Sequence, residues 1–285
     1  MPQCHDQTQL TNLDTNRIAE LLEPFLTDSP HLNNDGRSDN SRHSGNSHRS
    51  DHSCHSERSE ESGSGSDARL SQLQLENIST YIDLLLDWNA HINLTAIRQP
   101  EEIVTRHFGE SLFAARHLFP KTPTWEQPPK PTLSEAEGAV QAEQNSAQRV
   151  IDLGSGAGFP GIPIKIWAPE IALTLIESSQ KKATFLREVT RALTLTNINV
   201  FSGRAEHYST PSAQVVILRA VERFKSILPT AISLVAPGGR LALLISEAQL
   251  ATAQSLTSVF SWTSPIPIAQ SSSRILLIGI REASR

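Results

Sequence analysis

Residues 150–163 read VIDLGSGAGFPGIP and contain the strongest structural signal in this chain. A short apolar run with one acid is followed by glycines at three alternate positions and then by two prolines. Apolar residues on both faces are typical of a buried parallel strand, and glycine allows a tight turn that a ligand can approach closely. Proline is tolerated in a first helical turn, whose free amides attract a ligand. The stretch therefore predicts a strand, a glycine turn and a helix start that together hold a ligand.

The spacing of the glycines separates two kinds of nucleotide site. A dinucleotide fingerprint follows the pattern G-x-G-x-x-G, whereas Gly154, Gly156 and Gly158 come at alternate positions. Asp152, two residues before the first glycine, would repel a pyrophosphate but suits an amine-bearing ligand. The pattern D-x-G-x-G-x-G resembles motif I of class I methyltransferases, which bind S-adenosylmethionine. An ordinary glycine turn after a strand is the alternative that this motif alone leaves open.

From residue 149 onward, apolar strands alternate with helical segments. This alternation predicts an α/β fold, a Rossmann-like and mostly parallel sheet with helices on both faces, as in class I S-adenosylmethionine-dependent methyltransferases. Strands are predicted at 149–153, 171–176, 198–201, 214–218, 240–245 and 274–280. The last of these is expected beside a short strand near 259–262. Helices are predicted up to about 167, around 186–193 and at 224–235.

The first 120 residues have a different pattern. Apolar residues at helical spacing predict helices at 13–27, 70–90 and about 101–118, so residues 1–120 are expected to form an α-helical N-terminal extension. Two segments, 28–67 and 121–148, are too polar to bury a core and are predicted to be disordered or flexible insertions. The methyltransferase domain is then expected at 149–285.

Composition narrows the class further. The whole chain has 25 lysines and arginines against 30 aspartates and glutamates, but residues 149–285 have 14 against 8. A basic half is compatible with a polyanionic substrate or with an ordinary solvated surface. No signal peptide or apolar membrane span is visible, so a cytoplasmic protein with no membrane contact is expected. The irregularly spaced His31, His43, His48, His52, His55 and Cys54 are interpreted as low-complexity sequence, with no metal site.

Three charged residues fall at the carboxyl ends of neighbouring predicted strands, where open α/β sheets bind their ligands. Asp152 could hold an ammonium group directly or through water, or cap the turn. Glu177 could accept hydrogen bonds from ribose hydroxyls. Arg219 could bind a carboxylate or phosphate, or form a structural salt bridge. After the third strand, Ala205 and Glu206 could contact an adenine, although a surface turn is equally compatible with the sequence.

Several further motifs occur in a fixed order along the chain. Asn93-Leu94-Thr95-Ala96-Ile97 is followed by His107-Phe108-Gly109-Glu110-Ser111-Leu112, by the long glycine motif that ends Phe-Pro-Gly-Ile-Pro, and by Arg219-Ala220. Together they resemble the bacterial RsmG (GidB) family of small-subunit ribosomal RNA methyltransferases. The resemblance covers residues 70–120 and 149–245. The chain departs from the family pattern at Glu110, where aspartate is usual, at Leu218, where serine is usual, and at Ile245-Ser246-Glu247, where lysine and glycine are expected.

The resemblance implies methyl transfer from S-adenosylmethionine to N7 of a guanine in 16S ribosomal RNA, by direct attack of N7 on the sulfonium methyl. N7 carries an in-plane lone pair, so no general base is needed, and alignment of donor and acceptor would supply most of the catalysis. By resemblance, Gly154, Phe159, Ala205, Glu206 and Arg219 contact the cofactor, to which the strand-end reasoning adds Asp152, Gly156 and Glu177, and Asn93, Thr95, His107 and Ser111 line the acceptor side. His107 has the alternative role of a core or capping histidine.

The implied partner is 16S ribosomal RNA or the small ribosomal subunit, and the chain is expected to act as a monomer. Two rival functions remain open: a methyltransferase for a protein or small molecule, and a non-catalytic S-adenosylmethionine-binding ribosome assembly factor. A dehydrogenase is disfavoured by the glycine spacing.

Overall fold

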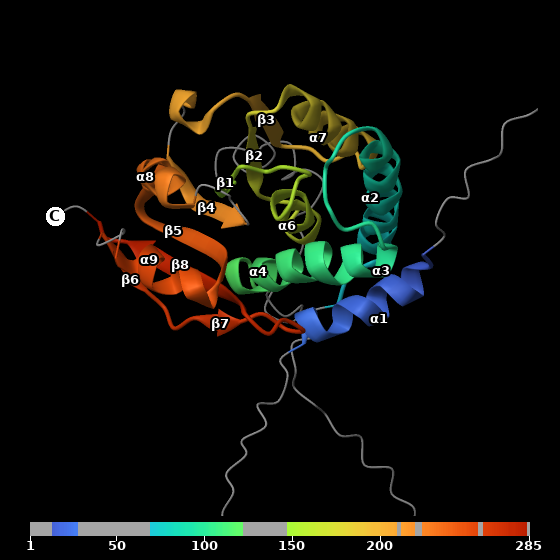
Figure 1. Cartoon of the computed structure of the whole chain (residues 1–285), viewed down its shortest axis with the longest axis horizontal. Coiled ribbons are helices and arrows are strands. Elements are labelled where there is room, and N and C mark those ends of the chain that lie inside the picture. The colour runs from blue at the N-terminus through green and yellow to red at the C-terminus, as the bar shows by residue number, and fades with distance from the viewer. Residues whose placement is uncertain are drawn as a thin grey trace, which may run out of the picture.

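The computed structural model describes residues 13–27, 69–121, 147–209, 212–219, 224–255 and 259–283. The predicted insertion at 28–67, with its histidines and Cys54, lies outside these residues, as does nearly all of the predicted insertion at 121–148. Within the described residues, one eight-stranded sheet lies between two layers of helices (Figure 1).

The sheet has the strand order β3-β2-β1-β4-β5-β8-β6, and β7 pairs with β8. The first five strands are parallel, while β8 runs antiparallel between β5 and β6. The strand order therefore reverses beside β1, which is where open α/β sheets place their ligands. The strands are β1 (Arg149–Leu153), β2 (Ala172–Glu177), β3 (Ile198–Ser202), β4 (Ala213–Arg219), β5 (Val235–Ser246), β6 (Phe260–Trp262), β7 (Ile266–Pro267) and β8 (Arg274–Arg281).

Alternate residues of each strand enter different hydrophobic layers. In β1, Val150 joins the layer under helices α6 (Gly161–Trp167) and α7 (Gln180–Ala192). Ile151 and Leu153 face the opposite layer, under α8 (Phe224–Leu234) and α9 (Leu250–Ser255). The two-residue period of a strand produces this division. The predicted Rossmann-like, mostly parallel sheet with helices on both faces is confirmed.

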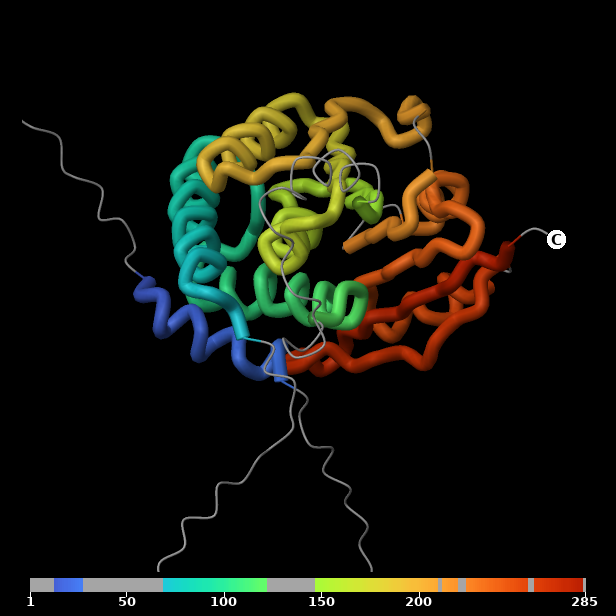
Figure 2. The backbone as a smooth tube through the Cα atoms, turned by 180° about the vertical axis from the view of Figure 1, so that it is seen from behind, coloured from blue at the N-terminus to red at the C-terminus, as the bar shows by residue number. Residues whose placement is uncertain are grey.

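The helices before β1 pack onto the same layer as α6 and α7. They are α1 (Thr15–Leu26), α2 (Gln72–His91) and α4 (Glu110–Leu118), and the short helix α3 (Pro100–Glu102), which has no buried residue, precedes α4. Figure 2 shows α1, α2 and α4 gathered on one side of the molecule, and their buried residues share one core with the α6 layer. The predicted N-terminal helix is confirmed. The domain boundaries at 120 and 148 stay a prediction, because the described helices and sheet share this core.

Two predicted elements differ in detail. The helix expected at about 101–118 contains a π-helical segment, η1 (Ile103–Gly109), between α3 and α4. Gly109, the last residue of this segment, packs closely against α1. A Cβ at this position would lie only 2.5 Å from the Phe25 ring. Strand β5 begins at Val235 rather than 240, and its pairing with β4 shifts register between Ala213 and Val215. The extra residues include Gly238, whose φ of 72° accommodates the irregularity.

Candidate functional site

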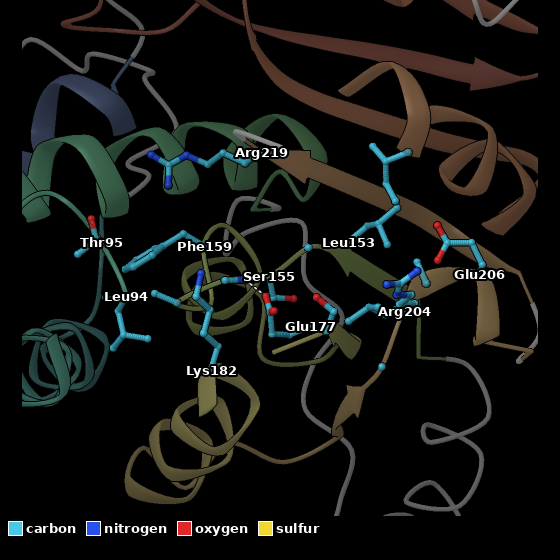
Figure 3. Close-up of a pocket in the computed structure, with 18 of the residues that line it drawn as sticks. Leu94, Thr95, Leu153, Ser155, Phe159, Glu177, Lys182, Arg204, Glu206 and Arg219 are labelled. Atoms are coloured by element: carbon cyan, nitrogen blue, oxygen red, sulfur yellow. Dashed lines mark hydrogen bonds between the residues drawn. The ribbon is translucent and has the colours of Figure 1, made fainter. Parts of the chain in front are cut away.

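A cavity of about 590 Å³ lies at the carboxyl ends of the central strands. Figure 3 shows the labelled residues around it, with Thr95, Leu94 and Phe159 toward one end in this view and Arg204 and Glu206 toward the other. Its lining comes from the glycine turn after β1, the end of β2, the turn after β3, the end of β4, two N-terminal segments and the first turns of α7 and α8. The cavity therefore occupies the position that the strand-end argument predicts.

The glycine turn holds its backbone in a conformation that favours glycine. The φ angles of Gly154, Gly156 and Gly158 are 76°, 57° and 91°. Gly154 and Ser155 each donate a backbone hydrogen bond of 3.0 Å to the Ile176 carbonyl, which ties the turn to β2. A Cβ on Gly156 would meet only the Gly154 carbonyl oxygen, at 3.9 Å. The backbone of Gly156 therefore faces open space in which a ligand can lie.

Glu177 ends β2 beneath this turn. One carboxylate oxygen accepts a hydrogen bond from the Gly156 amide at 2.9 Å, and the other accepts one from the Ser179 amide at 2.7 Å. The side chain is 7% exposed and lines the cavity. A carboxylate has about four acceptor positions, so a fixed Glu177 keeps acceptor capacity for ligand hydroxyls.

Asp152 lies behind the turn rather than in the cavity lining. Its side chain is 1% exposed and points to the same sheet face as Val150, because the two residues are two apart in β1. One oxygen accepts a hydrogen bond from the Gly161 amide at 3.0 Å, and the other is buried without a partner among the described residues. Burial raises the pKa of Asp152 to about 7. The capping alternative therefore describes what Asp152 does here, and a contact through water stays a prediction.

Phe159 lies at the centre of an aromatic stack beside the cavity. Its ring is parallel to Tyr81 within 4° at a centroid distance of 5.2 Å, and it stacks on His107 at 4.6 Å and 20°. The Tyr81 hydroxyl donates to the carbonyl of Ala157 in the glycine turn. The stack thus connects α2, η1 and the glycine turn and fixes the His107 ring at the edge of the cavity.

Hydrogen bonds determine which ring nitrogen of His107 carries the proton. An Arg219 guanidinium nitrogen lies 3.2 Å from His107 Nδ1 and can only donate, so Nδ1 is the acceptor. The proton is then on Nε2, which donates to Thr95 Oγ1 at 2.7 Å. Burial, with further effects from Arg219, Arg106 and Arg274, lowers the pKa of His107 to about 3. His107 is therefore neutral at physiological pH.

The hydrogen bonds around Thr95 leave its hydroxyl with a proton to donate. Its oxygen accepts from His107 and also from the Ile97 amide at 3.1 Å, so both lone pairs are occupied. The loop is held by Asn89, whose oxygen accepts from the amides of Leu94 and Thr95 at 2.9 and 3.0 Å. Thr95 lines the cavity. Its hydroxyl hydrogen is therefore available to a ligand atom that accepts hydrogen bonds.

Glu110 lies at the centre of an arginine cluster. Its side chain is 2% exposed, and its oxygens lie 3.0 Å from Arg219 Nη2, 3.2 Å from Arg274 Nε and 3.3 Å from Arg106 Nε. Arg219 also donates to the Arg106 carbonyl. The structural salt bridge considered for Arg219 is thus present, while Arg219 still lines the cavity.

Most, but not all, predicted site residues line the cavity. Three do not: Asp152 is buried behind the turn, Asn93 is exposed on its loop, and Ser111 is fully buried with its hydroxyl donating to the His107 carbonyl at 2.5 Å. The reasoning from sequence missed Tyr81, Asn89, Lys182 and the role of Glu110, of which Lys182 lines the cavity. The predicted residues in the lining are Thr95, His107, Gly154, Gly156, Phe159, Glu177, Ala205, Glu206 and Arg219.

The described residues lack two other kinds of feature. Among them, no group of three or more histidine, cysteine, aspartate or glutamate side chains could hold a metal ion. Their helices include none with the length and apolar character to span a membrane.

Comparison with known proteins gives the family. The family model described as rRNA small subunit methyltransferase G (GidB) matches residues 74–124 and 133–269. The chain belongs to this family. The resemblance found in the sequence is thereby confirmed, and with the strand order it also confirms the class I methyltransferase fold.

Curated relatives carry the name ribosomal RNA small subunit methyltransferase G. The relative from Caldanaerobacter subterraneus subsp. tengcongensis is 34% identical over 184 residues, covering 63% of this chain and 67% of the relative. The relative from Roseiflexus castenholzii is 37% identical over 177 residues, covering 60% and 65%. The relative from Alkaliphilus metalliredigens is 38% identical over 133 residues, covering 47% and 46%. The chain thus spans about half to two thirds of the length of these relatives.

Proposed function

We propose that this chain transfers a methyl group from S-adenosylmethionine to N7 of a guanine in 16S ribosomal RNA. Family membership supports the reaction class, and the names of the relatives support the RNA of the small subunit. The observation that carries the proposal is the cavity itself. It brings the glycine turn and Glu177 together with a neutral histidine and a threonine that can only donate.

The residues on one side of the cavity fit the proposed cofactor. Gly156 leaves room beside its backbone, where a Cβ would meet only the Gly154 carbonyl oxygen. Glu177 has acceptor capacity for the ribose hydroxyls, and Ala205 and Glu206 would lie along the adenine. The Lys182 ammonium suits the ligand's carboxylate. When bound, the cofactor supplies a methyl group activated by its attachment to a sulfonium.

The opposite side suits an acceptor that needs no deprotonation. Guanine N7 carries an in-plane lone pair and lies beside the O6 carbonyl. Both N7 and O6 accept hydrogen bonds. His107 has both ring nitrogens engaged and is neutral, so its task is to orient Thr95. The Thr95 hydroxyl can donate to O6 and so hold the base. The rate enhancement would come mainly from this alignment in a partly enclosed site.

The test uses the whole chain, radiolabelled S-adenosylmethionine, and small ribosomal subunits from a bacterial strain lacking its own family member. We expect incorporation into 16S ribosomal RNA, and mass spectrometry of nuclease fragments should identify one N7-methylguanine. Methyl transfer to another atom, or to protein alone, would contradict the proposal. Tight cofactor binding without methylation of any ribosomal substrate would instead favour the non-catalytic assembly factor.

A further inference from the structure

A second cavity, of about 320 Å³, lies next to the arginine cluster. It is formed where β5 ends, where η4 (Glu247–Gln249) begins, and where the turn between β7 and β8 comes close to η1. The residues that line it include two arginines and several hydroxyl and amide side chains but no acid. The lining residues are Arg106, Leu244, Ile245, Ser246, Gln249, Gln270, Ser271, Ser272, Ser273 and Arg274.

The charges beside this cavity do not balance. Three guanidinium groups, those of Arg106, Arg219 and Arg274, surround the single carboxylate of Glu110. Arg106 and Arg274 each turn the Nε atom toward Glu110, and their terminal nitrogens have no ion-pair or hydrogen-bond partner within the described ranges. Glu247, which follows the lining residue Ser246 in the sequence, is exposed and does not line the cavity. An excess of positive charge therefore faces this space.

The turn opposite the arginines is held in one conformation. Gln270 has a φ of 55°, the Ser271 hydroxyl accepts a hydrogen bond from the Arg274 amide at 3.2 Å, and the Ser273 carbonyl accepts one from the Glu247 amide at 2.9 Å. Ser272 and Ser273 are exposed, and their hydroxyls have no partner in the described part of the chain. Guanidinium forks and hydroxyl donors around one space are typical of a phosphate site.

We propose that this second cavity binds a backbone phosphate of the RNA beside the acceptor guanosine. The inference rests on the proposed function, and it adds a substrate-binding site next to the first cavity. Arg219 connects the two spaces, because it lines the first cavity and donates to the carbonyl of Arg106, which lines the second. A phosphate bound there would offset the unbalanced charge and fix the nucleotide chain relative to Thr95 and His107.

The decisive variant is Ser272→Asp, because it adds a negative charge at an exposed lip without disturbing the buried cluster. Ser264→Asp is the matched control, since Ser264 is an exposed serine of the same C-terminal region that does not line the cavity. A second variant, Arg274→Gln, removes one phosphate donor, and Arg149→Gln is its control at the opposite end of the sheet, where Arg149 donates to the Ser212 carbonyl. The probe is a single-stranded fragment of 16S ribosomal RNA, titrated at several salt concentrations, with S-adenosylmethionine titrated separately.

We expect Ser272→Asp and Arg274→Gln to weaken RNA binding several-fold and to raise KM for the ribosomal substrate. Loss of one phosphate contact to a single strand should reduce the slope of log K against log salt by about 0.7. The affinity for S-adenosylmethionine should stay unchanged in all four variants. Unaltered RNA affinity and salt slope in both test variants would overturn the phosphate site while leaving the proposed function intact. Failure of the unaltered protein to bind or methylate RNA would instead overturn both.

Discussion

The cavity at the carboxyl ends of the central strands has two walls that are built in different ways. The glycine wall, residues 153–159, 176–178 and 203–206, consists largely of backbone and of strand-end residues that follow their own strands directly. The arginine wall, formed by Thr95, His107 and Arg219 with Glu110 behind them, consists of side chains from distant segments. Arg219 and Glu110 are 109 residues apart in the chain. The first wall depends on local conformation, and the second depends on the packing of the whole molecule.

Behind each wall, outside the cavity lining, lies one buried carboxylate, and these two carboxylates are in opposite electrostatic situations. Glu110 is surrounded by three guanidinium groups, whereas Asp152 accepts one side-chain hydrogen bond from the Gly161 amide and has one oxygen with no partner among the described residues. Removal of the negative charge should therefore destabilise the protein at Glu110 and stabilise it at Asp152.

Glu110→Gln should have the largest effect. It leaves three arginines around a neutral amide, and the loss of one partner from a buried ion pair costs about 3–5 kcal/mol. Urea unfolding should show this loss, and methylation should fall far more than cofactor affinity because Glu110 touches only the arginine wall. Glu110→Asp keeps the charge on a shorter side chain and should recover much of the stability. An unchanged unfolding midpoint in Glu110→Gln would show that the carboxylate does not hold this wall.

Asp152→Asn should stabilise the protein instead of destabilising it, and the size of this stabilisation should depend on pH. The pKa of Asp152 is raised from 3.8 to about 7 in the folded protein, so the folded state binds the proton more tightly than the unfolded state. Stability then falls as pH rises from about 4 to 7 and stays constant above. Asparagine can still accept from the Gly161 amide and carries no charge. At pH 8 the variant should be more stable by roughly 2–4 kcal/mol, and near pH 4 the two proteins should match.

The same variant separates stability from binding. If Asp152 holds the cofactor's ammonium through water, Asp152→Asn should weaken cofactor binding while it stabilises the free protein. Calorimetric titration with S-adenosylmethionine at pH 8 measures the first effect, and thermal unfolding measures the second. Equal cofactor affinity in both proteins would leave Asp152 with its capping role alone.

The glycine wall could be predicted from the sequence because its signals are local. A strand, alternate glycines and an acid at the end of the next strand are enough to place Gly156 and Glu177 at one sheet edge. The same rule places Asp152 at the end of β1, and the two-residue period of the strand turns its side chain under α6, behind the glycine turn. In the arginine wall, the strand-end rule placed Arg219, whereas Thr95 and His107 could be identified only by resemblance. No sequence period relates Glu110 to Arg219, and the π-helical segment that sets the orientation of His107 leaves no periodic signal.

Gly156→Ala tests whether the glycine wall binds through its backbone. An alanine at a φ of 57° costs about 1–2 kcal/mol, and its methyl group would project into the space proposed for the cofactor. Gly238→Ala is the matched control, since Gly238 has a φ of 72° and a Cβ there would meet nothing within 4 Å. Both variants should lose similar stability in urea unfolding, but only Gly156→Ala should lose cofactor affinity, by tenfold or more. Equal affinity losses would show that backbone strain, rather than a steric contact, controls binding.

Thr95→Val should have the smallest effect on turnover. Valine matches the shape of threonine but has no hydroxyl, so it removes the bond donated to the substrate and also the acceptor of His107 and of the Ile97 amide. One hydrogen bond contributes about 0.5–1.5 kcal/mol, so loss of the donated bond should lower kcat/KM for the RNA substrate by roughly three- to tenfold. Thr95→Ser keeps the donor and should retain most of the activity. Cofactor affinity should be the same in both variants, because the glycine wall is unchanged. Loss of activity in Thr95→Ser equal to that in Thr95→Val would assign Thr95 a packing role.

The pH profile of turnover then decides whether the Thr95 hydroxyl acts through His107. The pKa of His107 is lowered from 6.5 to about 3, so the ring stays neutral, accepts from Arg219 and keeps its Nε2 proton directed at Thr95 throughout the range from pH 5 to 8. Turnover should therefore show no ionisation of a histidine in that range, in the unaltered protein and in Thr95→Ser alike. A protonation step near pH 6.5 that disappears in His107→Asn would contradict this arrangement. Such a step would mean that Nδ1 gains a proton and can no longer accept a hydrogen bond from Arg219. The guanidinium would then no longer determine that Thr95 donates its hydroxyl proton.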